Sequence, residues 1–248
     1  MTDPAIDPAD SLAAVALRAD DLRYERRSTA ARVSELLRDS ISRGELPPGT
    51  PLREAALGEA LGVSRNTVRE ALRLLDHEGL VVYHVHRGVT VRQLTKDDLR
   101  DLYRTREVIQ LAALGYAAAA PREALQAIAD VVTEAESAAA AGEWGTVATL
   151  DIVFHQKIVE LIGSNRINDF FRRIVAQLRI VFAAFDPTDH DRFVEWNRLL
   201  ADMLLAGEIE QCGSELRRYL ATAEQMLAEA LGPRSTAEGS SRSRPRTR

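Results

Sequence analysis

The sequence is poor in cysteine, since Cys212 is the only one in 248 residues. A disulfide needs two cysteines, so no bridge can form within the chain, and disulfide-dependent secreted domains are excluded. Long apolar runs are also missing, because the longest, residues 111–120, covers about half of a membrane span. Acidic residues precede the short apolar stretch 12–17, which reverses the charge order of a secretory signal. These absences predict a cytoplasmic protein with no membrane partner.

Signatures of catalysis are missing as well. The sequence has no glycine-rich phosphate loop, no nucleophile-elbow motif and no complete set of metal ligands. We therefore expect no enzymatic activity, although Asp151 and His155 alone could form half of a hydrolytic or metal centre.

Charge is unevenly distributed along the chain. Residues 28–95 carry nine basic and eight acidic side chains, whereas residues 96–232 carry 14 basic and 22 acidic ones. DNA binding by the first part would thus depend on local arginines rather than on bulk charge. The segment 233–248 has five arginines among Ser and Pro residues. We expect it, and the N-terminal segment 1–27, to be disordered.

The stretch "LGVSRNTVREALRLL" (61–75) predicts an amphipathic helix capped by Ser64. At about 100° per residue, one side is apolar and consists of Val68, Ala71, Leu72 and Leu75. The opposite side is polar and consists of Asn66, Arg69, Glu70 and Arg73, with Arg65 beside them at the start. Guanidinium and amide groups match the edges of guanine and adenine in a major groove. Periodicity alone is equally consistent with an ordinary solvated face.

The flanking segments favour the DNA-binding interpretation. A short helix is predicted over 53–62, ending at Gly62, with only Val63 before the Ser64 cap. Two helices joined by such a turn form a helix-turn-helix. Residues 78–94 then change to a β-hairpin pattern with Gly88 near its tip. The N-terminal domain, 28–94, is therefore predicted to be a winged helix.

The remaining sequence predicts an all-α antiparallel bundle of about six helices over 95–232, so that the chain as a whole is mainly α. The predicted helical runs are 95–119, 121–141, 143–161, 164–186, 189–206 and 208–231. Asp151 and His155 are four residues apart and flank the apolar stripe of 143–161, so both should project inward. Three interpretations stay open: a mutually satisfied pair, half of a metal site, or a polar anchor for an effector.

Residues 45–91, with the "PPG" turn, the "LGVSR..VREALR.L..EGLV" core and the "RG" wing tip, resemble the DNA-binding domain of GntR-family transcription regulators. Thr67 stands where most relatives have Pro, and members of the FadR subfamily carry a hydroxyl residue there. The resemblance implies that Arg65 and Arg69 contact bases or phosphates. The full candidate DNA-binding set is Arg53, Ser64, Arg65, Asn66, Thr67, Arg69, Arg73, His86, Arg87 and Gly88.

The second half resembles the effector-binding FCD domain of the FadR subfamily, on "LYRTREVIQLAALGYAA" (102–118) and "LDIVFHQKIVELIGSN" (150–165). Many relatives bind a divalent metal through one Asp and three His. Asp151 and His155 match the first two ligands, but Asn197 and Tyr219 stand at the other two positions. The resemblance thus implies an effector pocket without a tightly bound metal. If a metal is bound, its ligands are Asp151, His155 and Asn197, with His190 as a weak substitute.

Arg106 matches a family position that faces the pocket, where a guanidinium could clamp a carboxylate. Gln110 replaces the usual Glu four residues later, which would leave Arg106 freer for an anion. The alternative is a surface arginine paired with Asp97, Asp101 or Glu107. The effector-binding set is therefore Arg106, Asp151, His155, Asn197 and Tyr219.

Together these features predict a homodimeric repressor that binds double-stranded DNA at a pseudo-palindromic operator. A small organic, anionic effector in the helical bundle would modulate its affinity, with no cofactor required. The alternative is a ligand-independent architectural DNA-binding protein with an eroded effector site.

Overall fold

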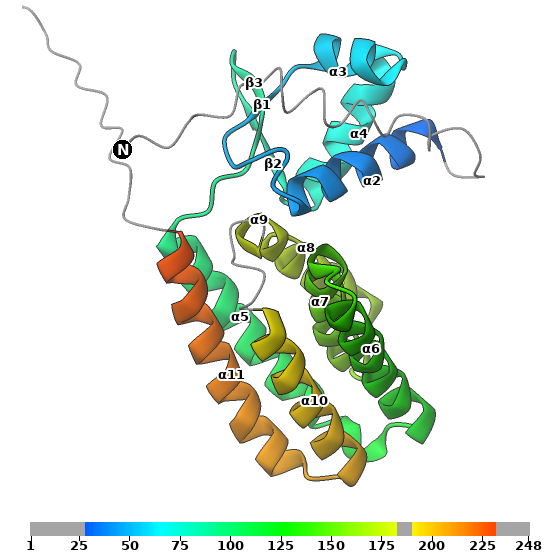
Figure 1. The fold of residues 1–248 in the computed structure, drawn as a ribbon, viewed down its shortest axis with the longest axis vertical. Helices are drawn as coiled ribbons and strands as arrows, with labels where there is room; N and C mark the ends of the chain where they lie inside the picture. Colours follow the sequence, from blue (N-terminus) through cyan, green and yellow to red (C-terminus); the bar gives the residue numbers. More distant parts are fainter. Residues whose placement is uncertain (1–27, 183–189, 232–248) are drawn as a thin grey trace, which may run out of the picture.

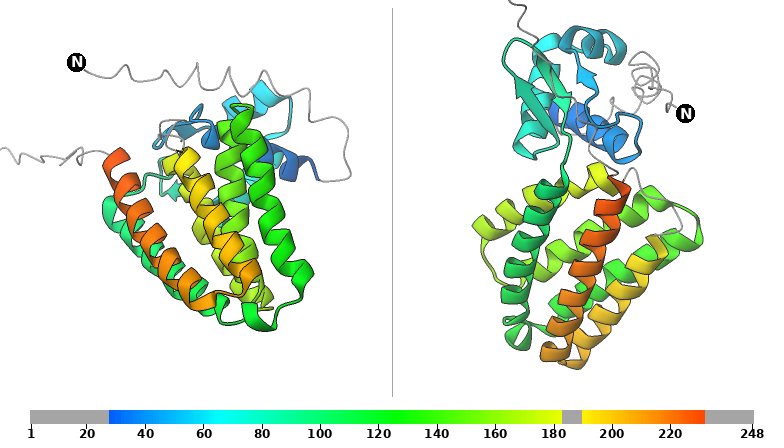
Figure 2. Two further views of the ribbon diagram at one scale, coloured as in Figure 1. Left: turned by 60° about the horizontal axis from the view of Figure 1, so that its bottom comes forward. Right: turned by 90° about the vertical axis from the view of Figure 1, so that its left-hand side faces the viewer.

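The computed structural model describes residues 28–182 and 190–231. The two segments predicted to be disordered, 1–27 and 233–248, lie outside these residues. A small helical and β part lies above a larger helical bundle in Figure 1, and Figure 2 shows the same division from two other directions.

The N-terminal part is the predicted winged helix. Its elements are α2 (Thr29–Ser42), β1 (Pro51–Leu52), α3 (Glu54–Leu61), α4 (Arg65–His77), β2 (Val81–His84) and β3 (Gly88–Val91). The strands form an antiparallel sheet in the order β1-β3-β2. In the β2–β3 hairpin, Val81 lies opposite Val91 and His84 lies opposite Gly88, so the predicted hairpin is confirmed. The sequence did not predict β1, which pairs with β3.

Apolar side chains at helical spacing explain the packing of this part. The four positions predicted to be the core face of α4 are fully buried and belong to one cluster with residues of α2, α3 and the sheet. Gly62 adopts φ 64° and ψ 31°, a left-handed conformation in which glycine carries no Cβ strain. The chain therefore turns from α3 into α4 within three residues, as predicted.

The C-terminal part is an all-α bundle, which confirms the predicted fold class. Its elements are α5 (Lys96–Leu114), η2 (Ala117–Ala119), α6 (Arg122–Ala140), α7 (Trp144–Glu160), α8 (Asn165–Ala176), α9 (Leu178–Phe182), α10 (His190–Ala206) and α11 (Ile209–Ala230). The start of α5 has the predicted capping box between Thr95 and Asp98. Helices α10 and α11 lie side by side in Figures 1 and 2.

The prediction of one continuous helix from 164 is wrong. The chain breaks at Gln177 between α8 and α9. Leu178, Val181 and Phe182 of α9 are buried in the core of the bundle, whereas Ile180 is buried in the core of the winged helix. Helix α9 therefore contacts both parts of the molecule.

Candidate functional site

The first turn of α4 is built around its cap. The Ser64 hydroxyl accepts a hydrogen bond from the Thr67 amide at 3.1 Å and lies 2.8 Å from the Thr67 hydroxyl. Ser64 thus satisfies a backbone donor that the helix itself cannot. Thr67 is therefore part of the cap, and its hydroxyl is already engaged.

The polar side of α4 faces water. Arg65, Asn66, Arg69 and Arg73 are all exposed, opposite the buried apolar side. Arg69 is held by the Glu54 carboxylate at the start of α3, with N–O distances of 2.9 and 2.7 Å. This contact lowers the pKa of Glu54 chiefly through the hydrogen bond to Arg69. Arg69 must exchange this carboxylate for a base or a phosphate if it contacts DNA.

The wing presents a basic tip. His86 has φ 62° and Gly88 has φ 83°, so both occupy the left-handed region at the turn between β2 and β3. The side chains of His86 and Arg87 are exposed. His84 instead bonds across the hairpin to the Thr90 hydroxyl at 2.9 Å. Arg53, at the start of α3, is exposed on the same part of the molecule.

A second group of polar residues is buried between four helices of the bundle. Arg106 and Gln110 come from α5, and the others come from α7, α10 and α11. We call this group the buried polar cluster; it consists of Arg106, Gln110, Asp151, His155, Asn197 and Tyr219. Every member is at most 4% exposed. The predicted effector-binding residues thus lie together, although they are far apart in sequence.

His155 is the centre of a hydrogen-bonded chain. Its Nδ1 lies 2.6 Å from Gln110 Oε1, and its Nε2 lies 2.9 Å from the Tyr219 hydroxyl. The tautomer of the neutral ring decides which of the two ring nitrogens donates and which accepts. Burial holds the pKa of His155 well below its ordinary value, and the nearby Arg106 cation lowers it further. His155 is therefore neutral near pH 7.

Asp151 is the other acceptor in the cluster. Asn197 Nδ2 donates to its Oδ1 at 2.8 Å, and the Tyr219 hydroxyl lies 3.1 Å from the same oxygen. Asp151 and His155 approach to only 3.8 Å, so Tyr219 links them in place of a direct hydrogen bond. Tyr219 has one hydroxyl proton, which can be given to His155 or to Asp151 but not to both.

Arg106 is fully buried, and the alternative of a surface ion pair is therefore wrong. Its guanidinium lies over the Tyr103 ring, 4.7 Å from the ring centroid. Burial lowers the pKa of Arg106, but Tyr103, Tyr219 and Asp151 outweigh this effect, so the group stays charged. Among the described residues, none of its three nitrogens has a partner at ideal hydrogen-bond geometry, although the Tyr103 and Tyr219 hydroxyls are close enough to interact with it. The amide nitrogen of Gln110 and the amide oxygen of Asn197 have no hydrogen-bond partner there.

The donor set of this cluster does not fit a divalent metal. Only Asp151 and His155 are ligands that transition metals favour, and both ring nitrogens of His155 are in hydrogen bonds. Arg106 adds a positive charge beside them. Within the described ranges, no three His, Cys, Asp or Glu side chains gather at metal-binding distance. His190 begins α10, and its side chain lies outside the described structure.

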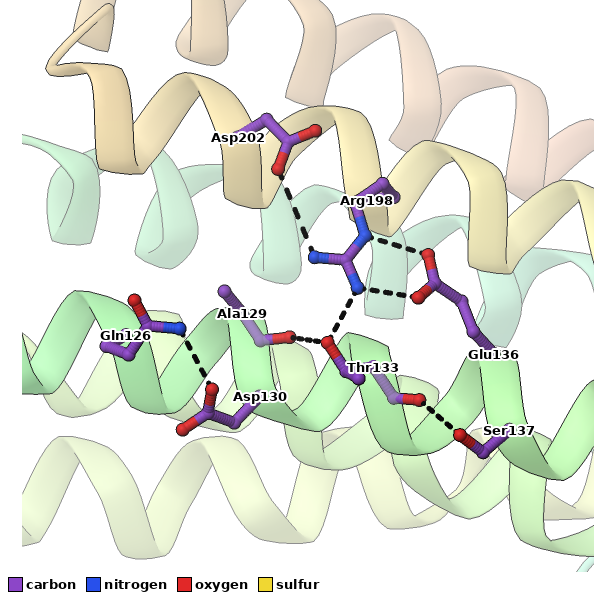
Figure 3. A network of polar contacts seen from close by, with 8 residues as sticks. All are labelled: Gln126, Ala129, Asp130, Thr133, Glu136, Ser137, Arg198 and Asp202. Atoms are coloured by element: carbon purple, nitrogen blue, oxygen red, sulfur yellow. Dashed lines mark hydrogen bonds and ion pairs between the residues drawn. The ribbon is translucent and has the colours of Figure 1, made fainter.

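Helix α10, which carries Asn197, is clamped to α6. Arg198 makes two hydrogen bonds to Glu136, at 2.8 and 2.7 Å, and a third to Thr133 at 2.9 Å (Figure 3). Asp202, one turn further along α10, lies 4.0 Å from the same guanidinium (Figure 3). Because Arg198 follows Asn197 directly, this clamp fixes the part of α10 that reaches into the buried polar cluster.

Two functional groups were missed by sequence reasoning. Gln110 was expected only to leave Arg106 free, but it also bonds to His155. Tyr103, the ring beneath Arg106, was not singled out, although a spacing of three residues on a helix places the two on one face. Helical spacing could therefore have found Tyr103, whereas the partner of Gln110 depends on how α5 packs against α7.

The fold and both sites are those of a winged-helix regulator joined to a helical domain. The family model for "Bacterial regulatory proteins, gntR family" matches residues 29–91, and the FCD domain model matches residues 101–222. The chain belongs to the GntR family of transcription regulators and carries an FCD domain. Members of this family are regulators rather than enzymes. Within the described residues, no helix is long and apolar enough to cross a bilayer.

Individual relatives agree with this assignment. A crystal structure of a GntR transcriptional regulator from Rhodococcus sp. RHA1 is 35% identical, with a TM-score of 0.72; the match covers 82% of this chain and 99% of that one. The "Probable D-xylose utilization operon transcriptional repressor" of Paenarthrobacter nicotinovorans is 26% identical over 85% of this chain and 93% of its own length. LutR of Bacillus subtilis (strain 168) is 26% identical over 76% of this chain and 96% of its own.

Proposed function

We propose that this regulator is a homodimeric repressor whose operator affinity is lowered by a small organic anion bound at the buried polar cluster. The observation that carries the proposal is Arg106, a fully buried cation that, among the described residues, has no carboxylate in a salt bridge and whose polar neighbours Tyr103 and Tyr219 lie outside ideal hydrogen-bond geometry. Unsatisfied buried donors cost roughly 1–3 kcal/mol each, and more when charged. Such a group is accounted for if a ligand supplies the missing acceptors.

The chemistry of the cluster favours a carboxylate that also carries a hydroxyl group. A guanidinium fork accepts a carboxylate through two parallel hydrogen bonds. The unpartnered amide nitrogen of Gln110 and amide oxygen of Asn197 offer a donor and an acceptor, which suit a hydroxyl. In this proposal no metal or other cofactor takes part, because the donor set described above lacks the ligands to hold one.

The outer face of α5 and α8 supports the homodimer. Val108 is 71% exposed and Phe170 is 53% exposed, and Ile109, Ile162 and Ile167 line the same apolar groove. Exposed aromatic and aliphatic groups gathered in this way are typical of interfaces. We assign a second copy of this chain as the occupant of the groove, which also contains the charged side chain of Arg166. A two-fold dimer also doubles the number of bases that a single recognition helix reads.

Sedimentation of a Val108→Asp variant tests the dimer. This change places a charge in the groove without disturbing the core, so we expect a folded monomer. Ala118→Asp, at an exposed position in η2, is the control and should sediment as wild type. A Val108→Asp protein that stays dimeric would show that this groove is not the dimer interface.

The alternative, a ligand-independent DNA-binding protein, is favoured by one observation. His155, Gln110, Tyr219 and Asn197 already bond within the cluster, as a purely structural network would. Arg106 is the member that this alternative leaves unexplained.

One experiment separates the two functions. Sequences bound by the protein are selected from random DNA, and binding is then measured with acetate, lactate, malate and citrate at constant ionic strength. The proposal predicts two half-sites related by two-fold symmetry, and weaker binding with at least one carboxylate. Arg106→Gln should lose this response, while Arg104→Gln, exposed on the same helix, should keep it. If no small carboxylate alters binding, the ligand-independent alternative is correct.

A further inference from the structure

A cleft of about 450 Å³ lies where the winged helix meets the bundle. The winged helix contributes Arg38 of α2 and the end of α4, with His77 and Glu78. The bundle contributes residues of α7, α8 and α9, among them Arg172, Arg173 and Arg179. The volume lies within the range of small-molecule sites, about 300–1,000 Å³. None of the residues of the buried polar cluster lines this cleft.

Positive charge is in excess in the cleft. Four arginines line it, against the two carboxylates of Glu78 and Asp169. Each carboxylate is already paired with one arginine. Arg38 makes a two-bond contact with Glu78, at 2.7 and 2.6 Å, and Arg172 lies 3.0 Å from Asp169.

The other two arginines have no carboxylate partner among the described residues. Arg179 donates to the neutral Thr149 hydroxyl at 3.0 Å. Burial lowers the pKa of Arg179, and the neighbouring Arg38 cation lowers it further. The carboxylates of Asp39 and Glu78 offset only part of this effect. Arg173 is exposed, and within the described ranges its guanidinium makes no hydrogen bond and no ion pair. The arginines that line the cleft therefore exceed its lining carboxylates by two charges.

We infer that this cleft binds the phosphate group of a small phosphorylated molecule, with Arg173 and Arg179 as its principal contacts. A phosphate monoester carries a charge of about −2 near neutral pH, which equals the excess in the cleft. Arginine forks match phosphate oxygens in geometry as well as in charge. The volume leaves room for an organic group beside the phosphate.

The DNA backbone is a less suitable occupant. The cleft is at the C-terminal end of α4, whereas Arg65 and Asn66 are at its other end. A helix of 13 residues spans about 20 Å at 1.5 Å per residue. A duplex held by the first turn of α4 therefore lies on the far side of the winged helix.

A ligand at this position would couple the two parts of the molecule. Arg179 precedes Ile180, the residue of α9 that is buried in the core of the winged helix. Nearby, Gly79 approaches the Gln177 side chain so closely that an added Cβ would lie 2.9 Å from its amide nitrogen. Binding that draws Arg173 and Arg179 toward Arg38 would fix the orientation of α9 against α2 and α4. Phosphate binding in this cleft does not involve Arg106 and does not require the effector proposed above.

The test measures thermal unfolding of the full chain during titration with inorganic phosphate and with glycerol 3-phosphate, and with sodium chloride at matched ionic strength. The unfolding temperature should rise saturably with either phosphate and not with chloride. Arg173→Gln and Arg179→Gln should each weaken phosphate binding by about tenfold, as expected for loss of a charge-assisted hydrogen bond. Arg122→Gln, exposed at the start of α6 and outside the cleft, is the control and should bind as wild type.

Two results would overturn the inference. In the first, phosphate and chloride act alike, or the Arg173→Gln and Arg179→Gln proteins respond as wild type. In the second, Arg173→Gln weakens operator binding in phosphate-free buffer and reduces its salt dependence, which would identify a DNA contact. Because Arg173 is exposed, its replacement leaves the fold intact even if Arg179→Gln does not fold. Neither result bears on Arg106 or on the recognition helix.

Discussion

The polar face of α4 and the buried polar cluster use similar side chains under opposite conditions. On α4, arginines and an asparagine face water, and Arg69 exchanges solvent for the Glu54 carboxylate at little cost. In the bundle, Arg106 and Asn197 are buried away from bulk solvent, so each polar atom without a partner lowers the stability. An exposed arginine can be satisfied by water, so its presence alone does not indicate a ligand. A buried polar group without a partner lowers the stability of the fold, so its presence requires an explanation such as a ligand.

The largest expected effect is on the free energy of unfolding, and it comes from a substitution on the buried side of α4. Leu72→Ala removes a fully buried side chain from the winged-helix core and should lower the free energy of unfolding by about 2–5 kcal/mol. Arg73→Ala, the next residue, is exposed and should leave it unchanged. Denaturant unfolding of both variants measures the difference. Equal losses would mean that the two sides of α4 are assigned wrongly.

The second effect concerns DNA binding by the exposed polar side of α4. Arg69→Ala should weaken operator binding by roughly ten- to hundredfold through loss of a base or phosphate contact. Glu54→Gln is the matched control, because it removes the carboxylate that competes for Arg69, and it should not weaken binding. Affinities are compared at one salt concentration. Wild-type affinity in Arg69→Ala would show that Arg69 serves only to join α3 to α4.

The third effect is a pH dependence of the buried cluster. The pKa of His155 is depressed in the folded protein. Below about pH 6.5, His155 is therefore protonated in the unfolded chain but stays neutral in the folded one. Stability from His155 is therefore complete above its unfolded pKa of about 6.5 and is lost as the pH falls below it, by up to about 1.4 kcal/mol per unit. Unfolding between pH 7.5 and 5.5 should show this slope. His155→Gln should flatten it, and an unchanged slope would assign the effect to other groups.

The smallest effect is expected at the exposed clamp of α10. Arg198→Ala removes the contacts with Glu136 and Thr133 and should cost about 0.2–1 kcal/mol, because water screens such pairs. The loss should shrink further in high salt. Denaturant unfolding at low and high salt measures both values. A loss of several kcal/mol, independent of salt, would show that the clamp behaves as a buried contact.

The sequence predicted features that depend on local spacing. The Ser64 cap, the left-handed Gly62, the buried side of α4 and the Thr95–Asp98 capping box all follow from residues within one or two turns. The same reasoning correctly placed Asp151 and His155 in the interior.

Features that depend on packing between distant segments were not predicted. Arg69 and Glu54 are 15 residues apart, and His155 bonds to residues 45 and 64 positions away. No glycine or proline marks the break at Gln177, and no local signal indicates that Ile180 is buried in the core of the winged helix. The arginine-rich cleft likewise combines residues from both parts of the chain. Such contacts depend on which helices pack against each other, and the spacing of apolar residues along the sequence does not reveal this.

The most direct test of the central claim measures the stability of Arg106→Met. In the proposed function, Arg106 is kept for a ligand at the expense of folding stability. Replacing it with an apolar side chain of similar length should raise the free energy of unfolding by on the order of 1 kcal/mol or more. The same variant should lose the response to carboxylates. A loss of several kcal/mol in Arg106→Met would show that the guanidinium holds the bundle together and would contradict the account.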